Sequence, residues 1–67
     1  MKLLIDESGS TYTLRAARKP GFTHVAVMHV VDSYVCSFDA VVDEERFTIA
    51  LTVDGQTTEC KIRLAYN

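Results

Sequence analysis

The feature that most constrains this chain is the alternation of apolar and polar residues at every second position, in runs between sparse turn residues. Val, Ile, Thr, Tyr and Phe dominate these runs, and such residues favour β-strands. The chain has 67 residues, a length that predicts one small domain spanning 1–67. The pattern predicts six strands, at 2–6, 11–18, 22–31, 34–42, 46–53 and 57–66.

Turn residues separate the expected strands. Asp54-Gly55 is the strongest turn signal, because a two-residue type I′ hairpin requires positive φ at both central residues. Pro20-Gly21 suits a type II turn, in which Pro fixes φ at the first central position and Gly accepts positive φ at the second. The remaining expected connections are the loop 7–10 and the two-residue turns Asp32-Ser33 and Asp43-Glu44.

Closing each hairpin on its turn sets the register and places the apolar residues on one common face. The expected opposite pairs include Ile5–Tyr12, Leu14–Val27, Val27–Phe38, Val25–Ala40, Ala40–Phe47, Phe38–Ile49, Ile49–Cys60 and Phe47–Ile62. This agreement predicts an all-β, antiparallel up-and-down meander, curled into a small barrel or folded into a two-layer sandwich. A helix over 38–47 is the competing interpretation, but Glu45 would then lie on its apolar stripe.

The net charge of −2 argues against broad electrostatic binding to nucleic acid, which needs a surplus of Lys and Arg. The acidic residues gather between 22 and 45, a stretch without lysine or arginine. The first apolar run is too short for a signal peptide or a membrane span. Two cysteines are fewer than a secreted mini-domain usually carries. We therefore expect a cytoplasmic protein with reduced thiols.

The expected register brings Tyr12, His29 and Cys36 together on the inner face. A thiol beside an imidazole is the starting point of a nucleophilic site, and with His24 and Cys60 it forms part of a candidate zinc site. A structural role is favoured instead, because no CxxC or HxxxH spacing is present and no acid orients the histidine. We expect no enzyme activity, catalytic residue, metal or cofactor.

The outer face of the expected strands 22–31 and 34–42 is unusually apolar. A solvent face of a β-protein is mostly polar, and an apolar patch often marks a protein interface. The alternatives are that another part of the chain covers these strands, or that the register differs there. The predicted interface residues are Met28, Val30, Val35 and Val41, flanked by Arg15 and Asp39.

A second cluster on the outer face is basic. Arg46 is expected opposite Arg63, with Lys61 nearby, and like charges directly opposite are unfavourable. A phosphate would relieve them, which makes an oligonucleotide-binding small barrel the alternative function. The net charge and the lack of an aromatic residue beside these bases count against it, and a solvated charged face is the simpler interpretation.

The leading functional hypothesis is a small non-enzymatic protein-binding module, a regulator, inhibitor or small subunit of the kind found in phages and mobile elements. No Walker loop, dinucleotide fingerprint, zinc spacing, RNP motif or nucleophile elbow appears in the sequence. The expected partner is another protein or a second copy of the chain, which would give a homodimer. Nucleic acid is a weaker expectation, and no membrane is expected.

Overall fold

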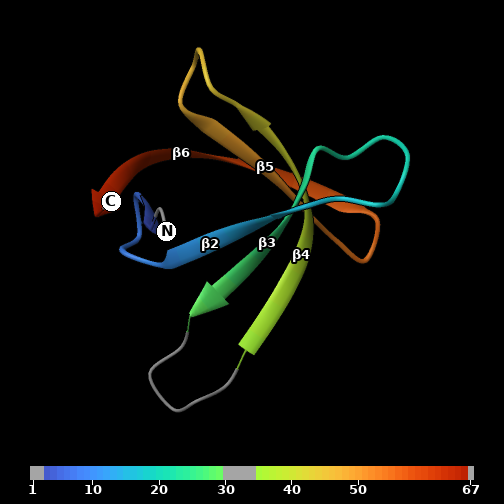
Figure 1. The fold of residues 1–67 in the computed structure, drawn as a ribbon, viewed down its shortest axis with the longest axis horizontal. Coiled ribbons are helices and arrows are strands. Elements are labelled where there is room, and N and C mark those ends of the chain that lie inside the picture. Colours follow the sequence, from blue (N-terminus) through green and yellow to red (C-terminus); the bar gives the residue numbers. More distant parts are fainter. Residues whose placement is uncertain (1–2, 30–34, 67) are drawn as a thin grey trace.

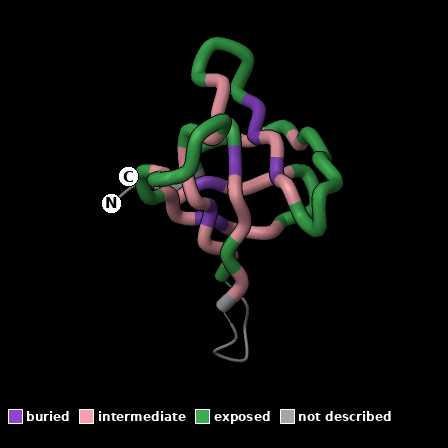
Figure 2. The backbone as a smooth tube through the Cα atoms, turned by 90° about the vertical axis from the view of Figure 1, so that its right-hand side faces the viewer, coloured by how far each residue is buried: buried purple, intermediate pink, exposed green. Residues whose placement is uncertain are grey.

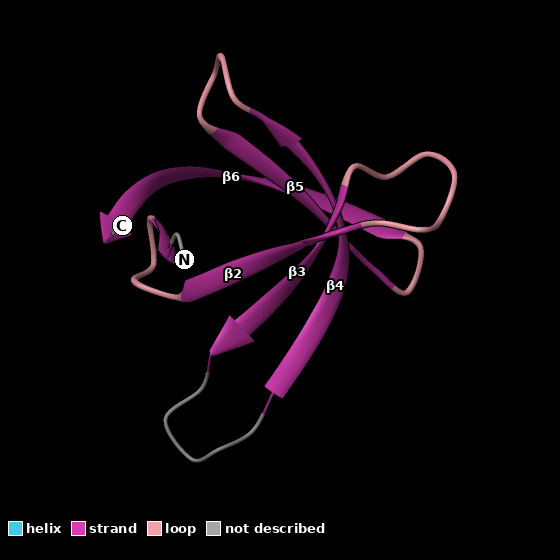
Figure 3. Cartoon of the chain, viewed as in Figure 1, coloured by secondary structure: helices cyan, strands magenta, loops and turns pink. Residues whose placement is uncertain are grey.

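Six antiparallel strands, with no helix, make up the part of the chain that this computed structural model describes (Figures 1 and 3). It describes residues 3–29 and 35–66, and their side chains except those of Val35, Ala65 and Tyr66. No helix long and apolar enough to cross a membrane occurs in these residues. The strands are β1 (Leu3–Asp6), β2 (Thr11–Ala16), β3 (His24–His29), β4 (Val35–Asp43), β5 (Thr48–Val53) and β6 (Gln56–Tyr66).

The strands form a closed barrel in which each pairs with the next and β1 pairs with β6. Closure depends on the length of β6, which has 11 residues. Its first half pairs with β5 and its second half with β1, so it arches across one side of the molecule in Figure 1. The all-β meander is thus confirmed, and of the two expected architectures the chain adopts the barrel, which leaves no open sheet edge.

Local turn chemistry accounts for three of the connections. Asp54 and Gly55 have φ values of 50° and 78°, as the two central residues of a type I′ turn require. Gly21 has a φ of 90°, and the Phe22 N–H donates to the Lys19 carbonyl at 3.3 Å, which fits the expected type II turn. The loop 7–10 is also found where expected. The expected turn at Asp32-Ser33 lies outside the described residues.

The connection between β4 and β5 differs from the expected two-residue turn. Residues 44–47 form a longer turn, held by Asp43, whose Oδ1 accepts the N–H groups of Glu45 and Arg46 at 3.0 and 3.1 Å. Ala40 consequently lies opposite Leu51 instead of Phe47. The shift is even, so β4 keeps its expected inward face. The expectation that Phe47 lies in the core is wrong, because Phe47 is 64% exposed.

The register of β3 also differs from the expectation, by one residue. Ala26, and not Val27, lies opposite both Leu14 of β2 and Phe38 of β4. A one-residue slip exchanges the two faces of a strand. Inward positions of β3 are therefore His24, Ala26 and Met28, and outward positions are Val25, Val27 and His29. A separate one-residue slip in β1 puts Leu4, and not Ile5, opposite Tyr12.

Packing inside a narrow barrel explains the slip. Ala26 and Ala40 are fully buried, and each lies beside a large residue, Phe38 and Leu51 respectively. Small and large side chains commonly alternate in this way to fill a small barrel. The buried core consists of Leu4, Tyr12, Ala26, Ala40, Ile49 and Leu51. Figure 2 shows the buried residues within the strands, and exposed residues both in the connections and along the strands.

Candidate functional site

Phe47 is the most exposed large apolar residue in the described part of the chain. It ends the β4–β5 turn, which projects at the top of Figure 1, and it has a φ of 53°. A residue other than glycine in this left-handed region costs roughly 1–2 kcal/mol. The Phe47 carbonyl accepts the Ile62 N–H at 2.9 Å, which ties the turn to β6. The ring is therefore exposed on a backbone that neighbouring strands hold in place.

A pocket of about 800 Å³ lies beside Phe47. Apolar side chains from five strands line it, together with Phe47 and the exposed Leu64. The other apolar lining residues are Leu4, Leu14, Ala16, Val27, Val42 and Ile62. The pocket thus includes side chains from both faces of β2 and β3.

Charged side chains also line this pocket. These are Arg15 of β2, Arg63 of β6, Asp43 at the end of β4 and Glu44 in the turn that follows it. Neither arginine forms an ion pair with an acidic residue that the structure describes. The Asp43 carboxylate, by contrast, is already engaged with two N–H groups of the turn.

The structure assembles only part of the interface predicted from the sequence. Met28 was expected on the outer face, but it packs against the buried core because of the β3 slip. Val30 lies outside the described residues, as does the side chain of Val35. Val41 is 40% exposed on the outer face, as expected.

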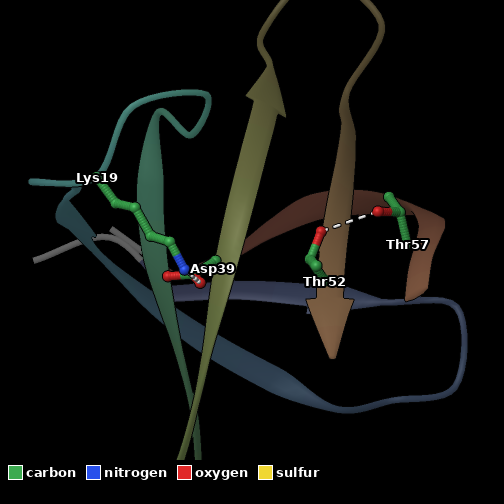
Figure 4. A network of polar contacts seen from close by, with 4 residues as sticks. All are labelled: Lys19, Asp39, Thr52 and Thr57. Carbon is green, nitrogen blue, oxygen red and sulfur yellow. Dashed lines mark hydrogen bonds and ion pairs between the residues drawn. The ribbon is translucent and has the colours of Figure 1, made fainter. Parts of the chain in front are cut away.

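The two charged residues expected to flank that interface lie apart in the structure. Arg15 is exposed and lines the pocket. Asp39 forms an ion pair with Lys19 at 3.2 Å (Figure 4). The same view shows the outward hydroxyls of Thr52 and Thr57, 2.9 Å apart, on β5 and β6. The outer face therefore carries these polar side chains on β4, β5 and β6, while the β3 slip places Val25 and Val27 on it.

The expected grouping of Tyr12, His29 and Cys36 does not form. Tyr12 and Cys36 flank Met28 on the inner face, whereas His29 faces outward, with its Nε2 3.1 Å from the Thr13 hydroxyl. Histidine and thiol are thus on opposite faces of the sheet, and general-base activation of Cys36 by His29 has no geometric basis. Among the described residues, no three or more His, Cys, Asp or Glu side chains are placed to hold a metal ion.

The expected row of basic residues is also absent. Arg46 lies in the β4–β5 turn, where it approaches Glu59 at 4.0 Å. Arg63 lies opposite Ile5 of β1, not opposite Arg46, and Lys61 lies opposite Thr48. The longer turn explains the difference, because it removes Arg46 from the strand ladder.

A carboxylate clamp that the sequence analysis missed fastens β1 to β2. Asp6 Oδ1 accepts hydrogen bonds from the N–H and hydroxyl of Ser8 and from the N–H of Ser10, and Oδ2 accepts one from the buried Tyr12 hydroxyl. Burial alone would raise the pKa of Asp6, but these hydrogen bonds together lower it. Burial, with the bond to Asp6, raises the pKa of Tyr12. An aspartate two residues before Ser-Gly-Ser was the available sequence signal.

Cys60 is predicted to be a slow nucleophile. It is free, half-buried and opposite Ile49. Burial raises the pKa of its thiol, and the Asp6 and Glu7 carboxylates raise it further. In a Cys36→Ser variant at pH 7.5, we expect an aromatic disulfide reagent to label Cys60 at least about tenfold more slowly than in the urea-unfolded chain. Equal labelling rates would contradict this environment.

Among the described residues, the exposed Phe47 ring and the pocket beside it are the strongest candidates for a binding site. No protein-family model, curated protein or solved structure matches the chain.

Proposed function

We propose that this chain is a small non-enzymatic protein-binding module, a regulator, inhibitor or small subunit, whose contact surface is centred on Phe47. The observation that carries the proposal is a 64% exposed aromatic residue held at positive φ. Residues in sparsely populated backbone regions cluster at ligand clamps and other functional positions. Aromatic side chains are also common among the few residues that dominate binding at protein interfaces.

Two further exposed apolar residues support a contact surface in this part of the barrel. Val41 lies on the outer face of the same β4–β5 hairpin, and Leu64 lines the same pocket as Phe47. Full burial of each such side chain supplies roughly 1.5–3 kcal/mol before the costs of association. Arg46 and Glu59, an exposed pair beside the turn, suit the polar rim of an interface. Val41 is the part of the predicted interface that this proposal retains.

The setting we propose is the cytoplasm, because both described cysteines are free and small domains of oxidising compartments usually carry disulfides. A phage or mobile-element origin is compatible with so small and acidic a chain. Oligonucleotide binding has less support, because Arg46 approaches Glu59 and does not join Arg63 in a basic row.

Phe47→Gly tests the proposal, since it removes the ring and relieves the positive φ. We expect unchanged or slightly higher thermal stability, together with a Kd for the partner that rises about 30-fold, the effect of losing a typical hot spot. Val53→Ala is the matched control, because Val53 is also exposed but does not line the pocket. The partner is first captured from host lysate on the wild-type chain, and its Kd is then measured by calorimetry with purified components.

Self-association is measured in parallel by analytical ultracentrifugation, because a second copy is one candidate partner. A partner or dimer that binds wild type and Phe47→Gly equally well would contradict the proposed surface. Loss of binding in Val53→Ala as well would point to a different face of the barrel.

A further inference from the structure

We propose that the pocket beside Phe47 binds a small amphipathic carboxylate, with its apolar chain inside the pocket and its carboxylate on Arg15 and Arg63. This site goes beyond the proposed protein contact, because it requires only the isolated barrel.

The size and lining of the pocket suit such a ligand. Sites for small molecules typically have volumes of about 300–1,000 Å³ and mostly apolar walls, and this pocket measures about 800 Å³. Leu14, Val42 and Ile62 contribute aliphatic side chains that are only partly buried in the ligand-free barrel. Ala16 lines the pocket with a single methyl group. An alkyl chain would remove this apolar surface from water.

The charges of the lining favour a carboxylate with a defined orientation. Arg15 and Arg63 project from β2 and β6, the two strands that flank β1. A guanidinium group binds a carboxylate through two parallel hydrogen bonds, and the acidic residues that the structure describes form no ion pair with either arginine. Asp43 ends β4, and Glu44 lies in the turn that follows it. Their negative charge would disfavour an anionic headgroup beside them.

Binding is tested on the purified chain with three ligands that share a ten-carbon tail, each used below its micelle concentration. Decanoate is expected to bind saturably with one site per chain, decanol at least about tenfold more weakly, and decyltrimethylammonium more weakly still. Calorimetry gives the affinities, and amide chemical shifts locate the site. The absence of saturable decanoate binding would overturn the proposal, and equal binding of all three ligands would overturn the role of the arginines.

Two variants test the location of the site. Ala16→Phe fills the pocket from an exposed position, and it is expected to weaken decanoate binding at least tenfold while the thermal midpoint stays within a few degrees of wild type. Gln56→Phe adds the same ring at an exposed β6 position outside the pocket and should leave binding unchanged. Arg63→Gln should reduce decanoate affinity, and Arg15→Gln combined with Arg63→Gln should reduce it to that of decanol.

Unchanged decanoate binding in both Ala16→Phe and Arg63→Gln would place the ligand elsewhere and overturn the assignment. These measurements involve no protein partner, so their failure is separate from a failure of the partner test with Phe47→Gly.

Discussion

Ala26→Asp is expected to unfold the domain, whereas Val27→Asp should leave it folded. Ala26 is completely buried between Leu14 and Phe38, so an aspartate there would be a buried charge without a partner. Such a charge costs several kcal/mol, about as much as the whole stability of so small a domain. Val27 is half-buried on the outer face, where the substitution should cost about 1 kcal/mol, the span of β-propensities.

Far-ultraviolet circular dichroism and urea unfolding at 25 °C distinguish the two variants. The pair is matched, because adjacent residues of β3 receive the same charged side chain and differ only in the face on which they lie. A folded Ala26→Asp beside an unfolded Val27→Asp would show that β3 has the opposite register.

Asp6→Ala is expected to lower the free energy of unfolding by about 3 kcal/mol. A buried donor left without a partner costs roughly 1–3 kcal/mol, and the hydrogen bonds that Ser8 and Ser10 donate to the charged carboxylate are lost as well. The orphaned donor is the Tyr12 hydroxyl, which belongs to a residue only 2% exposed. Asp6→Asn, which keeps an acceptor, should cost less. In a cycle with Tyr12→Phe, the two substitutions should couple by at least about 1 kcal/mol, and additive effects would contradict the clamp.

The same clamp predicts how stability depends on pH. The pKa of Asp6 is lower in the folded chain than its usual value, so folding favours the ionised carboxylate. Its contribution is complete above the unfolded pKa of about 3.9 and is lost as the pH falls through the lower folded pKa. Urea midpoints measured from pH 7 to pH 2.5 should therefore fall below about pH 4 more steeply for wild type than for Asp6→Asn. If the urea midpoints of wild type and Asp6→Asn fell in parallel as the pH is lowered, the loss of stability in acid would come from other carboxylates.

Neither the exposed Phe47 nor the pocket could be identified from sequence pattern. Phe47 falls at an inward position of the expected strand 46–53, so alternation alone placed it in the core. Its exposure depends on the longer β4–β5 turn, which Asp43 holds through hydrogen bonds to the backbone. The pocket combines residues from β1, β2, β3, β4 and β6, and their proximity exists only once the barrel closes.

The sequence by itself determined the strand content, the order of the hairpins and the turns at Pro20-Gly21 and Asp54-Gly55. These features are local, because β-propensity and the need for positive φ act within a few residues. Only the tertiary structure decided which face of β1 and β3 lies inside. Leu3, Leu4 and Ile5 are all apolar, and β3 carries aliphatic residues on both faces. The alternation of apolar and polar residues therefore does not distinguish one register of these strands from the other. Closing the barrel removes the ambiguity, because its narrow interior admits the small side chain of Ala26 and leaves the β-branched valines outside.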